Sequence, residues 1–134
     1  ESEAWIACVR SKELWSSLHF MRDKIIYLAG LFDGEGCVTY KQRREHRKGK
    51  PRSYLYWQIR IEINMIDKDT IDFVAETLGC GSRDYRPPYP HQNYGQHRWQ
   101  CTHRDAYEVA KCLEPYSITK KEKLRKVIDH YEKS

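Results

Sequence analysis

The sequence has no apolar run that approaches the roughly 18 residues of a membrane-spanning helix, so it predicts no membrane span. Its five cysteines are odd in number and include no C-x-x-C pair, which argues against a disulfide framework and a zinc ribbon. We therefore expect reduced thiols and an intracellular protein, with no preference among organellar, bacterial and phage origins. The sequence also lacks a phosphate-binding loop, a dinucleotide-binding motif and a nucleophile–histidine arrangement.

Positive charge is concentrated in one short segment. The net charge is +5 over 134 residues, and residues 41–52 alone hold seven Lys and Arg against one Glu. This segment therefore carries +6, which leaves −1 for the remainder. Such a run is typical of an arm that contacts phosphates, although a merely solvated basic loop has the same composition.

Residues 28–36, LAGLFDGEG, join a helix face of small residues to acids and to a glycine break that leads into a strand. Gly30 and Gly34 lie four apart, so they leave one helix face without side chains, which suits close packing of two helices. Glu35 falls at the end of that helix, where Gly36 can break it. If the partner helix is a second copy, two Glu35 carboxylates converge and form a metal site. The alternative is a buried glycine-rich helix followed by a turn.

This stretch resembles the signature of the LAGLIDADG homing endonucleases. Single-motif members act as homodimers, so the resemblance implies a homodimer through the motif helix, with an interface of Ala29, Gly30, Asp33 and Gly34. It also implies that Glu35 and the Gly34 carbonyl ligate the metal, with Mg²⁺ or another divalent ion as cofactor. Asp33 matches the second acidic position, which is usually structural.

Apolar periodicity predicts an α+β fold with the order αββαββα and one extra N-terminal helix. We expect an extension over residues 1–22, with a helix over 3–20, and an endonuclease domain over 23–134, with Asp23 as the N-cap of the motif helix. The other predicted elements are strands over 37–44, 54–65, 82–86 and 98–102 and helices over 67–78, 105–113 and 119–131. Thr119 is the expected cap of the last helix. This order is that of the family, whose four-stranded antiparallel sheet binds DNA.

One face of the sheet is expected to lie in the major groove of double-stranded DNA. Alternation is clearest over residues 54–65, where apolar side chains from Leu55 to Met65 would face inward. The candidate DNA contacts are Thr39, Lys41, Arg43, Arg44, Arg47, Lys48, Gln58, Arg60, Glu62, Asn64, Ser82, Asp84, Arg86, Arg98 and Gln100. On the strand over 82–86 the expected outward row is Ser82, Asp84 and Arg86, and Arg83 would enter it if the register shifted by one. A solvated sheet face is the alternative.

Two further catalytic candidates follow from their positions in the matched elements. Asp67 follows the long strand, where family members often carry a polar residue that orients water at the metal, and it could equally cap the next helix. Lys120 matches a position where family members often place a lysine near the scissile phosphate. Lys121 would take this role if the register slipped by one, and a plain surface lysine is the alternative.

Taken with the resemblance to the family, the sequence predicts a sequence-specific endonuclease encoded within an intron or an intein. It would act as a homodimer and use Mg²⁺ to make double-strand breaks in a long, near-palindromic DNA site. One alternative is a non-cleaving nucleic-acid binder on the same fold, such as an intron maturase or a transcription regulator. Another is a small interaction domain with a basic loop. The acid at Glu35 favours the enzyme, because a pure binder has no need of it.

Overall fold

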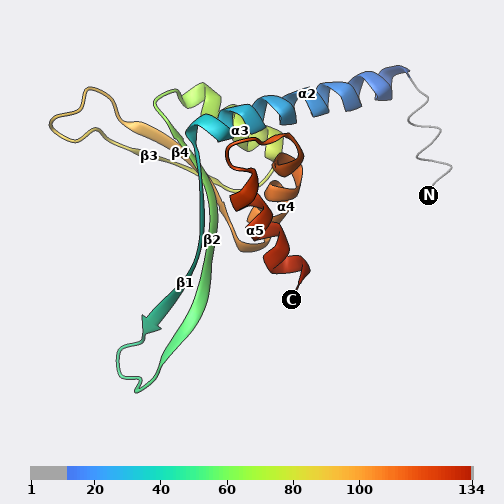
Figure 1. The fold of residues 1–134 in the computed structure, drawn as a ribbon. Coiled ribbons are helices and arrows are strands. Elements are labelled where there is room, and N and C mark those ends of the chain that lie inside the picture. The colour runs from blue at the N-terminus through green and yellow to red at the C-terminus, as the bar shows by residue number, and fades with distance from the viewer. Residues whose placement is uncertain (1–11, 134) are drawn as a thin grey trace.

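The computed structural model describes residues 12–133. Its elements are α2 (Lys12–Glu35), β1 (Gly36–His46), β2 (Ser53–Met65), α3 (Lys68–Leu78), β3 (Ser82–Arg86), β4 (Gln96–Thr102), α4 (His103–Leu113), the 3-10 turn η1 (Glu114–Tyr116) and α5 (Lys121–Glu132). The strands form one antiparallel sheet in the order β1-β2-β4-β3. The helices lie against one face of this sheet, as Figure 1 shows. The predicted α+β class and the four-stranded antiparallel sheet are thereby confirmed.

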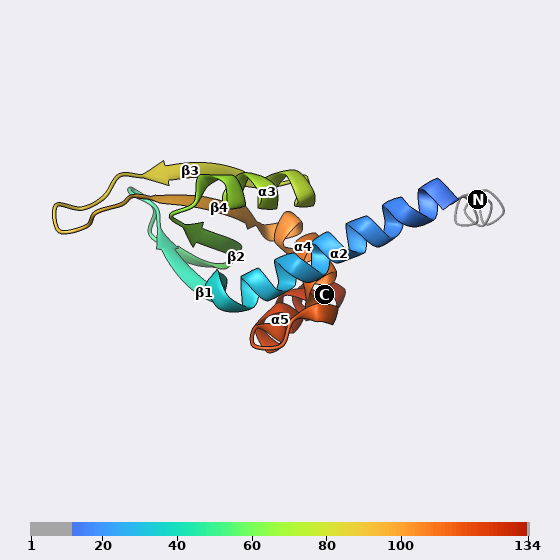
Figure 2. The ribbon, with the colours of Figure 1, turned by 90° about the horizontal axis from the view of Figure 1, so that it is seen from above.

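Helix α2 is one continuous helix of 24 residues. Asp23 lies in its interior, so the prediction that Asp23 caps a separate motif helix was wrong. No Gly or Pro interrupts residues 12–29, and a helix propagates through such a stretch at little cost. The predicted boundary after residue 22 falls inside this helix, and the first part of the predicted helix over 3–20 lies outside the described residues. At 1.5 Å per residue α2 is about 36 Å long, and its N-terminal half projects beyond the sheet (Figure 2).

The core lies between the apolar face of the sheet and the helices. Ile59, Ile61 and Ile63 of β2 are fully buried there, together with Trp99 of β4 and Phe32 of α2. This burial confirms the predicted alternation over the inner half of β2 and accounts for the face on which the helices pack.

The outer half of β2 departs from the prediction. Leu55 and Trp57 were expected to face the core, but they are 52% and 37% exposed. The β1–β2 hairpin is long and extends past the helices (Figure 1), so Leu55 lies beyond the helical layer, whereas Trp57 is partly covered by the ring of His130 on α5. Among the described residues no helix is long and apolar enough to cross a membrane.

Gly36 marks the end of α2 for a different reason from the one expected. The helix does end at Glu35, but Gly36 is not among the residues with positive φ. A Cβ at this position would instead overlap the ring of Phe32, so the close approach of the strand to that buried ring requires glycine.

Candidate functional site

The strand register places the predicted polar residues on one face of the sheet. Directly opposed residues of antiparallel strands point to the same face, and Glu62 lies opposite Gln100, which lies opposite Ser82. This face, which we call the polar face, carries Thr39, Lys41 and Arg43 of β1, Gln58, Arg60, Glu62 and Asn64 of β2, Arg98 and Gln100 of β4, and Ser82, Asp84 and Arg86 of β3. It lies opposite the helices.

The register also decides the one position of β3 that periodicity left open, and it places Arg44. Arg83 pairs with the buried Trp99, so it points to the helix side, where its Nη1 lies 2.8 Å from Asp72 Oδ1 of α3. The predicted row of Ser82, Asp84 and Arg86 is therefore the correct one for β3. Arg44 pairs with Leu55 and so lies on the opposite side of β1 from the polar face, and its predicted DNA contact would come from the basic segment of the hairpin.

Acids and bases are interleaved on the polar face. Arg98 Nε donates to Asp84 Oδ1 at 3.0 Å, and Arg98 Nη1 lies 3.8 Å from Glu62 Oε2. Arg60 Nη2 lies 3.5 Å from Glu62 Oε1. The hydrogen bond from Arg98 lowers the pKa of Asp84, and the same bond raises the pKa of Arg98. These pairs hold side chains of three strands in fixed positions and present donors and acceptors together.

Two buried polar atoms on this face have no hydrogen-bond partner among the described residues: Arg60 Nε and Gln100 Oε1. Leaving a buried donor or acceptor unpaired costs roughly 1–3 kcal/mol. A ligand with its own polar edge would relieve this cost. Base edges in the major groove offer such donors and acceptors.

The tip of the β1–β2 hairpin carries the basic segment. Arg44 Nη1 donates to Ser53 Oγ at 2.7 Å, and Arg47 Nε donates to the Tyr54 hydroxyl at 2.9 Å, with its guanidinium 4.9 Å from the ring centroid. Arg43 Nε donates to Gln58 Oε1 on the polar face. Lys48 lies in the turn itself. The arginines are therefore partly tied to the hairpin, whereas the whole tip is exposed.

Glu35 is the last residue of α2, and it is exposed together with Gly34. The final carbonyls of a helix have no intrahelical partner and form the negative end of its dipole, so this end attracts a cation. Among the described residues no three His, Cys, Asp or Glu side chains are grouped to hold a metal. Glu35 and the Gly34 carbonyl of one chain therefore offer at most part of a metal site.

Asp33 holds the loop that leads into α5. Its Oδ2 accepts from the Ile118 amide at 2.8 Å, and its Oδ1 accepts from the Ser117 hydroxyl and from the Lys120 amide at 3.3 Å. Burial raises the pKa of Asp33, but the hydrogen bonds from residues 117–120 outweigh it and the net pKa is lowered. Both carboxylate oxygens are engaged, in agreement with the structural role expected for this position.

The start of α5 differs from the prediction. Thr119 does not cap the helix, because its hydroxyl donates to the Asp33 carbonyl at 3.1 Å and Lys120 occupies the N-cap position. Lys121 Nζ donates to the Glu114 carbonyl at 2.8 Å, so its ammonium group is directed back toward η1. Of the two lysine candidates, Lys120 is the one whose backbone is tied to the end of α2.

Asp67 occupies the N-cap of α3. Its Oδ2 accepts from the Thr70 amide at 3.2 Å and from the Thr70 hydroxyl, and the latter bond is the main reason that its pKa is lowered. The capping alternative is therefore present in the structure. The catalytic role of Asp67 stays a prediction.

The glycine face of α2 is open. A Cβ on Gly30 or Gly34 would meet nothing within 4 Å, so no part of the described chain packs there. Ala29 was expected on this face but is 0% exposed, because successive helical residues are about 100° apart and Ala29 turns into the core. Ile26 and Tyr27 flank the glycines and are 43% and 56% exposed. Helical spacing from Gly30 could have identified both residues.

No family model matches the sequence, and no match was found among curated proteins. Solved structures do match. The homing endonuclease I-CvuI, in complex with its target in the presence of Ca, superposes with a TM-score of 0.62 at 17% identity over 80% of this chain and 64% of its own. The LAGLIDADG homing endonuclease I-GzeII, in complex with a DNA target, gives 0.58 at 17% identity over 81% of this chain and 36% of its own. This chain has the LAGLIDADG homing endonuclease fold.

The same fold appears in an archaeal intron-encoded homing endonuclease, I-Vdi141I, complexed with DNA. The TM-score is 0.59 at 13% identity over 78% of this chain and 64% of that one. The chain thus spans less than two thirds of the length of the homing endonucleases that it matches here. The resemblance carried by residues 28–36 is confirmed for the fold, with α2 as the helix that carries the LAGLIDADG motif.

Proposed function

We propose that this chain is one subunit of a homodimeric, sequence-specific DNA endonuclease that requires a divalent metal, with Mg²⁺ as our candidate. The observation that carries the proposal is the position of Glu35. It is exposed at the end of α2, beside a helix face without side chains, and β1 of the polar face begins at the next residue. One short segment thus connects an assembly surface, an acid and a recognition surface.

Assembly would use the open face of α2. Two copies of this helix could approach closely at Gly30 and Gly34, with Ile26 and Tyr27 covered at the margin. A twofold axis at that contact would bring the two Glu35 carboxylates together, since each lies one residue beyond Gly34. Each subunit would then supply half of a metal site.

Hydrolysis of a phosphodiester requires an activated water and neutralisation of the charge that develops on the phosphate and on the leaving oxygen. A bound divalent metal supplies these functions. In this chain the Glu35 carboxylate and the Gly34 carbonyl would hold it, and both are hard oxygen ligands of the kind that Mg²⁺ prefers. The bond from Lys120 N to Asp33 would keep the Lys120 ammonium beside the scissile phosphate, where it stabilises charge as it builds. Asp67 would orient a water molecule.

Recognition would use the polar face and the basic hairpin. Arg, Gln and Asn side chains can each make bidentate contacts with base edges, and Glu62 or Asp84 can accept from cytosine N4. The exposed tip, with Arg47 and Lys48, would contact phosphates. The three structures of this fold described above are complexes with DNA or with a target, and one of those proteins is archaeal and intron-encoded. They support extending DNA binding and an intron-encoded, intracellular origin to this chain.

The test compares binding and cleavage on one DNA site. A site is first selected by binding from a randomised duplex library, and then Glu35→Gln is compared with the wild type by gel shift and by plasmid nicking with Mg²⁺. We expect the variant to bind within about threefold of wild type, because recognition lies on the sheet, and to lose cleavage. Glu76→Gln on the exposed side of α3 removes the same charge elsewhere and should cut normally.

Two outcomes would contradict the proposal. Undiminished cutting by Glu35→Gln would show that this carboxylate holds no catalytic metal. Tight binding by a wild type that never cuts, with or without Mg²⁺, would assign the chain to the non-cleaving nucleic-acid binders.

A further inference from the structure

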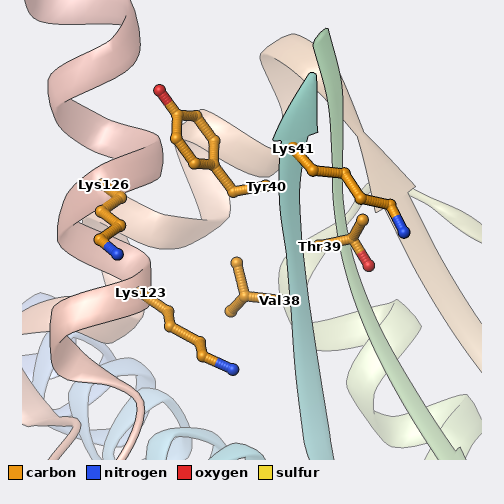
Figure 3. Close-up of a pocket in the computed structure, with 6 residues that line it drawn as sticks. All are labelled: Val38, Thr39, Tyr40, Lys41, Lys123 and Lys126. Carbon is orange, nitrogen blue, oxygen red and sulfur yellow. The ribbon is translucent and has the colours of Figure 1, made fainter. Parts of the chain in front are cut away.

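A groove of ≈ 290 Å³ lies between the edge strand β1 and helix α5. It is lined by Val38, Thr39, Tyr40, Lys41, Lys123 and Lys126, and Figure 3 shows these side chains. Thr39 and Lys41 belong to the polar face, whereas Val38 and Tyr40 point toward α5. Four consecutive residues that alternate between faces line one groove, so the groove passes around the open edge of β1.

The groove is strongly basic. Three lysines line it and no carboxylate does. Lys123 and Lys126 are both exposed and make no ion pair with another described residue. Two acids of α5 lie near them in sequence. Glu122, which precedes Lys123, makes no ion pair with either lysine, and Asp129 is already engaged, with its carboxylate 3.5 Å from Arg125 Nε and 3.7 Å from Lys133 Nζ. Two like charges one turn apart on a helix repel each other unless an anion lies between them.

The walls of the groove are held in place by an aromatic cluster. The Tyr40 hydroxyl lies 3.1 Å from His130 Nδ1, and the Tyr40 ring stacks on Trp57 with centroids 4.7 Å apart. Trp57 in turn contacts His130 at 5.1 Å between centroids. These contacts fix α5 against the β1–β2 hairpin, so the lysines of α5 keep a constant position relative to the polar face.

We propose that this groove binds phosphates of the DNA strand that borders the sheet, a contact made from outside the sheet by Lys123 and Lys126. The inference rests on the proposed function. Four strands about 4.8 Å apart span roughly 14 Å between the outer strands, which is close to the width of about 12 Å of the major groove. A duplex that receives this sheet therefore runs a phosphate strand past each sheet edge, and β1 is one of those edges.

The chemistry of the groove fits the sugar–phosphate backbone rather than the bases. Ammonium groups are strong donors to phosphate oxygens, and the Thr39 hydroxyl can add a further donor. The aromatic rings of Tyr40 and Trp57 are engaged with each other and with His130, which leaves no free ring for stacking on a base within this wall. The lysines of α5 would therefore contribute affinity and register but no sequence preference.

The test is the salt dependence of DNA binding. Equilibrium binding of the wild type, Lys123→Gln, Lys126→Gln and the double variant is measured between 50 and 200 mM salt, on the selected site and on an unrelated duplex. The log–log slope should become shallower by about 0.9 for each phosphate contact removed, with an unchanged ratio of specific to non-specific affinity. Lys111→Gln is the matched control, because Lys111 is paired with Glu108 on α4, away from the groove.

A charge-preserving pair distinguishes the role of charge from that of shape. Lys123→Arg and Lys126→Arg together should restore the wild-type slope, and unfolding midpoints of all variants should agree with the wild type. A double Gln variant with an unchanged slope would overturn the inference while leaving the proposed function intact. A change in site preference would also overturn it, because it would place these lysines at base edges. A wild type whose binding is weak and independent of salt would instead refute the proposed function itself.

Discussion

Replacing Asp33 by Asn should loosen the joint between the motif helix and the loop before α5. The carboxylate accepts from two donors at Oδ1 and from the Ile118 amide, at 2.8 Å, at Oδ2. An Asn side chain has one acceptor oxygen, which can keep the bonds from Ser117 and Lys120. Its amide nitrogen would then face the Ile118 amide, donor against donor. A hydrogen bond to a charged group contributes about 1.5–3 kcal/mol.

Ile118 is 84% exposed, so water can satisfy its amide in the variant, which places the expected loss of unfolding free energy near the lower limit, at about 1–2 kcal/mol. Urea denaturation at pH 7 measures it, with all proteins at one concentration because a dimer would make stability depend on concentration. Glu76→Gln is the control, and we expect it to stay within about 0.5 kcal/mol of the wild type.

The pH dependence supplies an independent check. The folded-state pKa of Asp33 lies below its ordinary value of 3.8. The contribution of the carboxylate is therefore complete above pH 3.8 and is lost as the pH falls through the lower folded-state pKa. The wild type and Asp33→Asn should thus converge in stability only in strong acid. Equal stability at pH 7, or a difference that does not shrink in acid, would refute the role assigned to Asp33.

Three further predictions concern the helix end and the assembly. Gly30→Leu should fold, because nothing lies within 4 Å of a Cβ there, but it should sediment as a monomer where the wild type is a dimer; a wild-type monomer at micromolar concentration, with and without DNA, would contradict this. Lys120→Met should slow cleavage by about 10²-fold or more, with little effect on binding, whereas Lys121→Met should not, as single-turnover rates would reveal. Gly36→Ala should destabilise the fold by about 1–3 kcal/mol through overlap with the Phe32 ring, and a wild-type denaturation midpoint would exclude this clash.

Local sequence determined much of the fold. The alternation over residues 54–65 identifies β2 and its two faces, because side chains of a strand alternate whatever lies beside it. Residues 28–36 identify the motif helix, its glycine face and the acid at its end. The two-residue alternation of side chains along the strand was enough to assign Gln58, Arg60, Glu62 and Asn64 to one face of the sheet.

The burial or capping role of a residue could not be predicted from local sequence where it depends on a neighbouring element. Whether Leu55 and Trp57 are covered depends on how far the helices extend over the hairpin: α5 reaches Trp57 through His130 and covers it in part, and Leu55 stays exposed. The failure of Thr119 as a cap has a similar origin, whereas that of Asp23 is local. Asp23 lies within a helix that nothing in the sequence interrupts, and Thr119 is drawn to a carbonyl of α2.

Contacts between segments distant in sequence were decided only by the tertiary structure. The register of β3 on β4 selected Ser82, Asp84 and Arg86 over Arg83, because it places Arg83 opposite the buried Trp99 and therefore on the helix side. The basic groove joins residues 38–41 to Lys123 and Lys126, which no local pattern relates. The physical reason is that periodicity reports the face on which a side chain lies, whereas packing decides what that face meets.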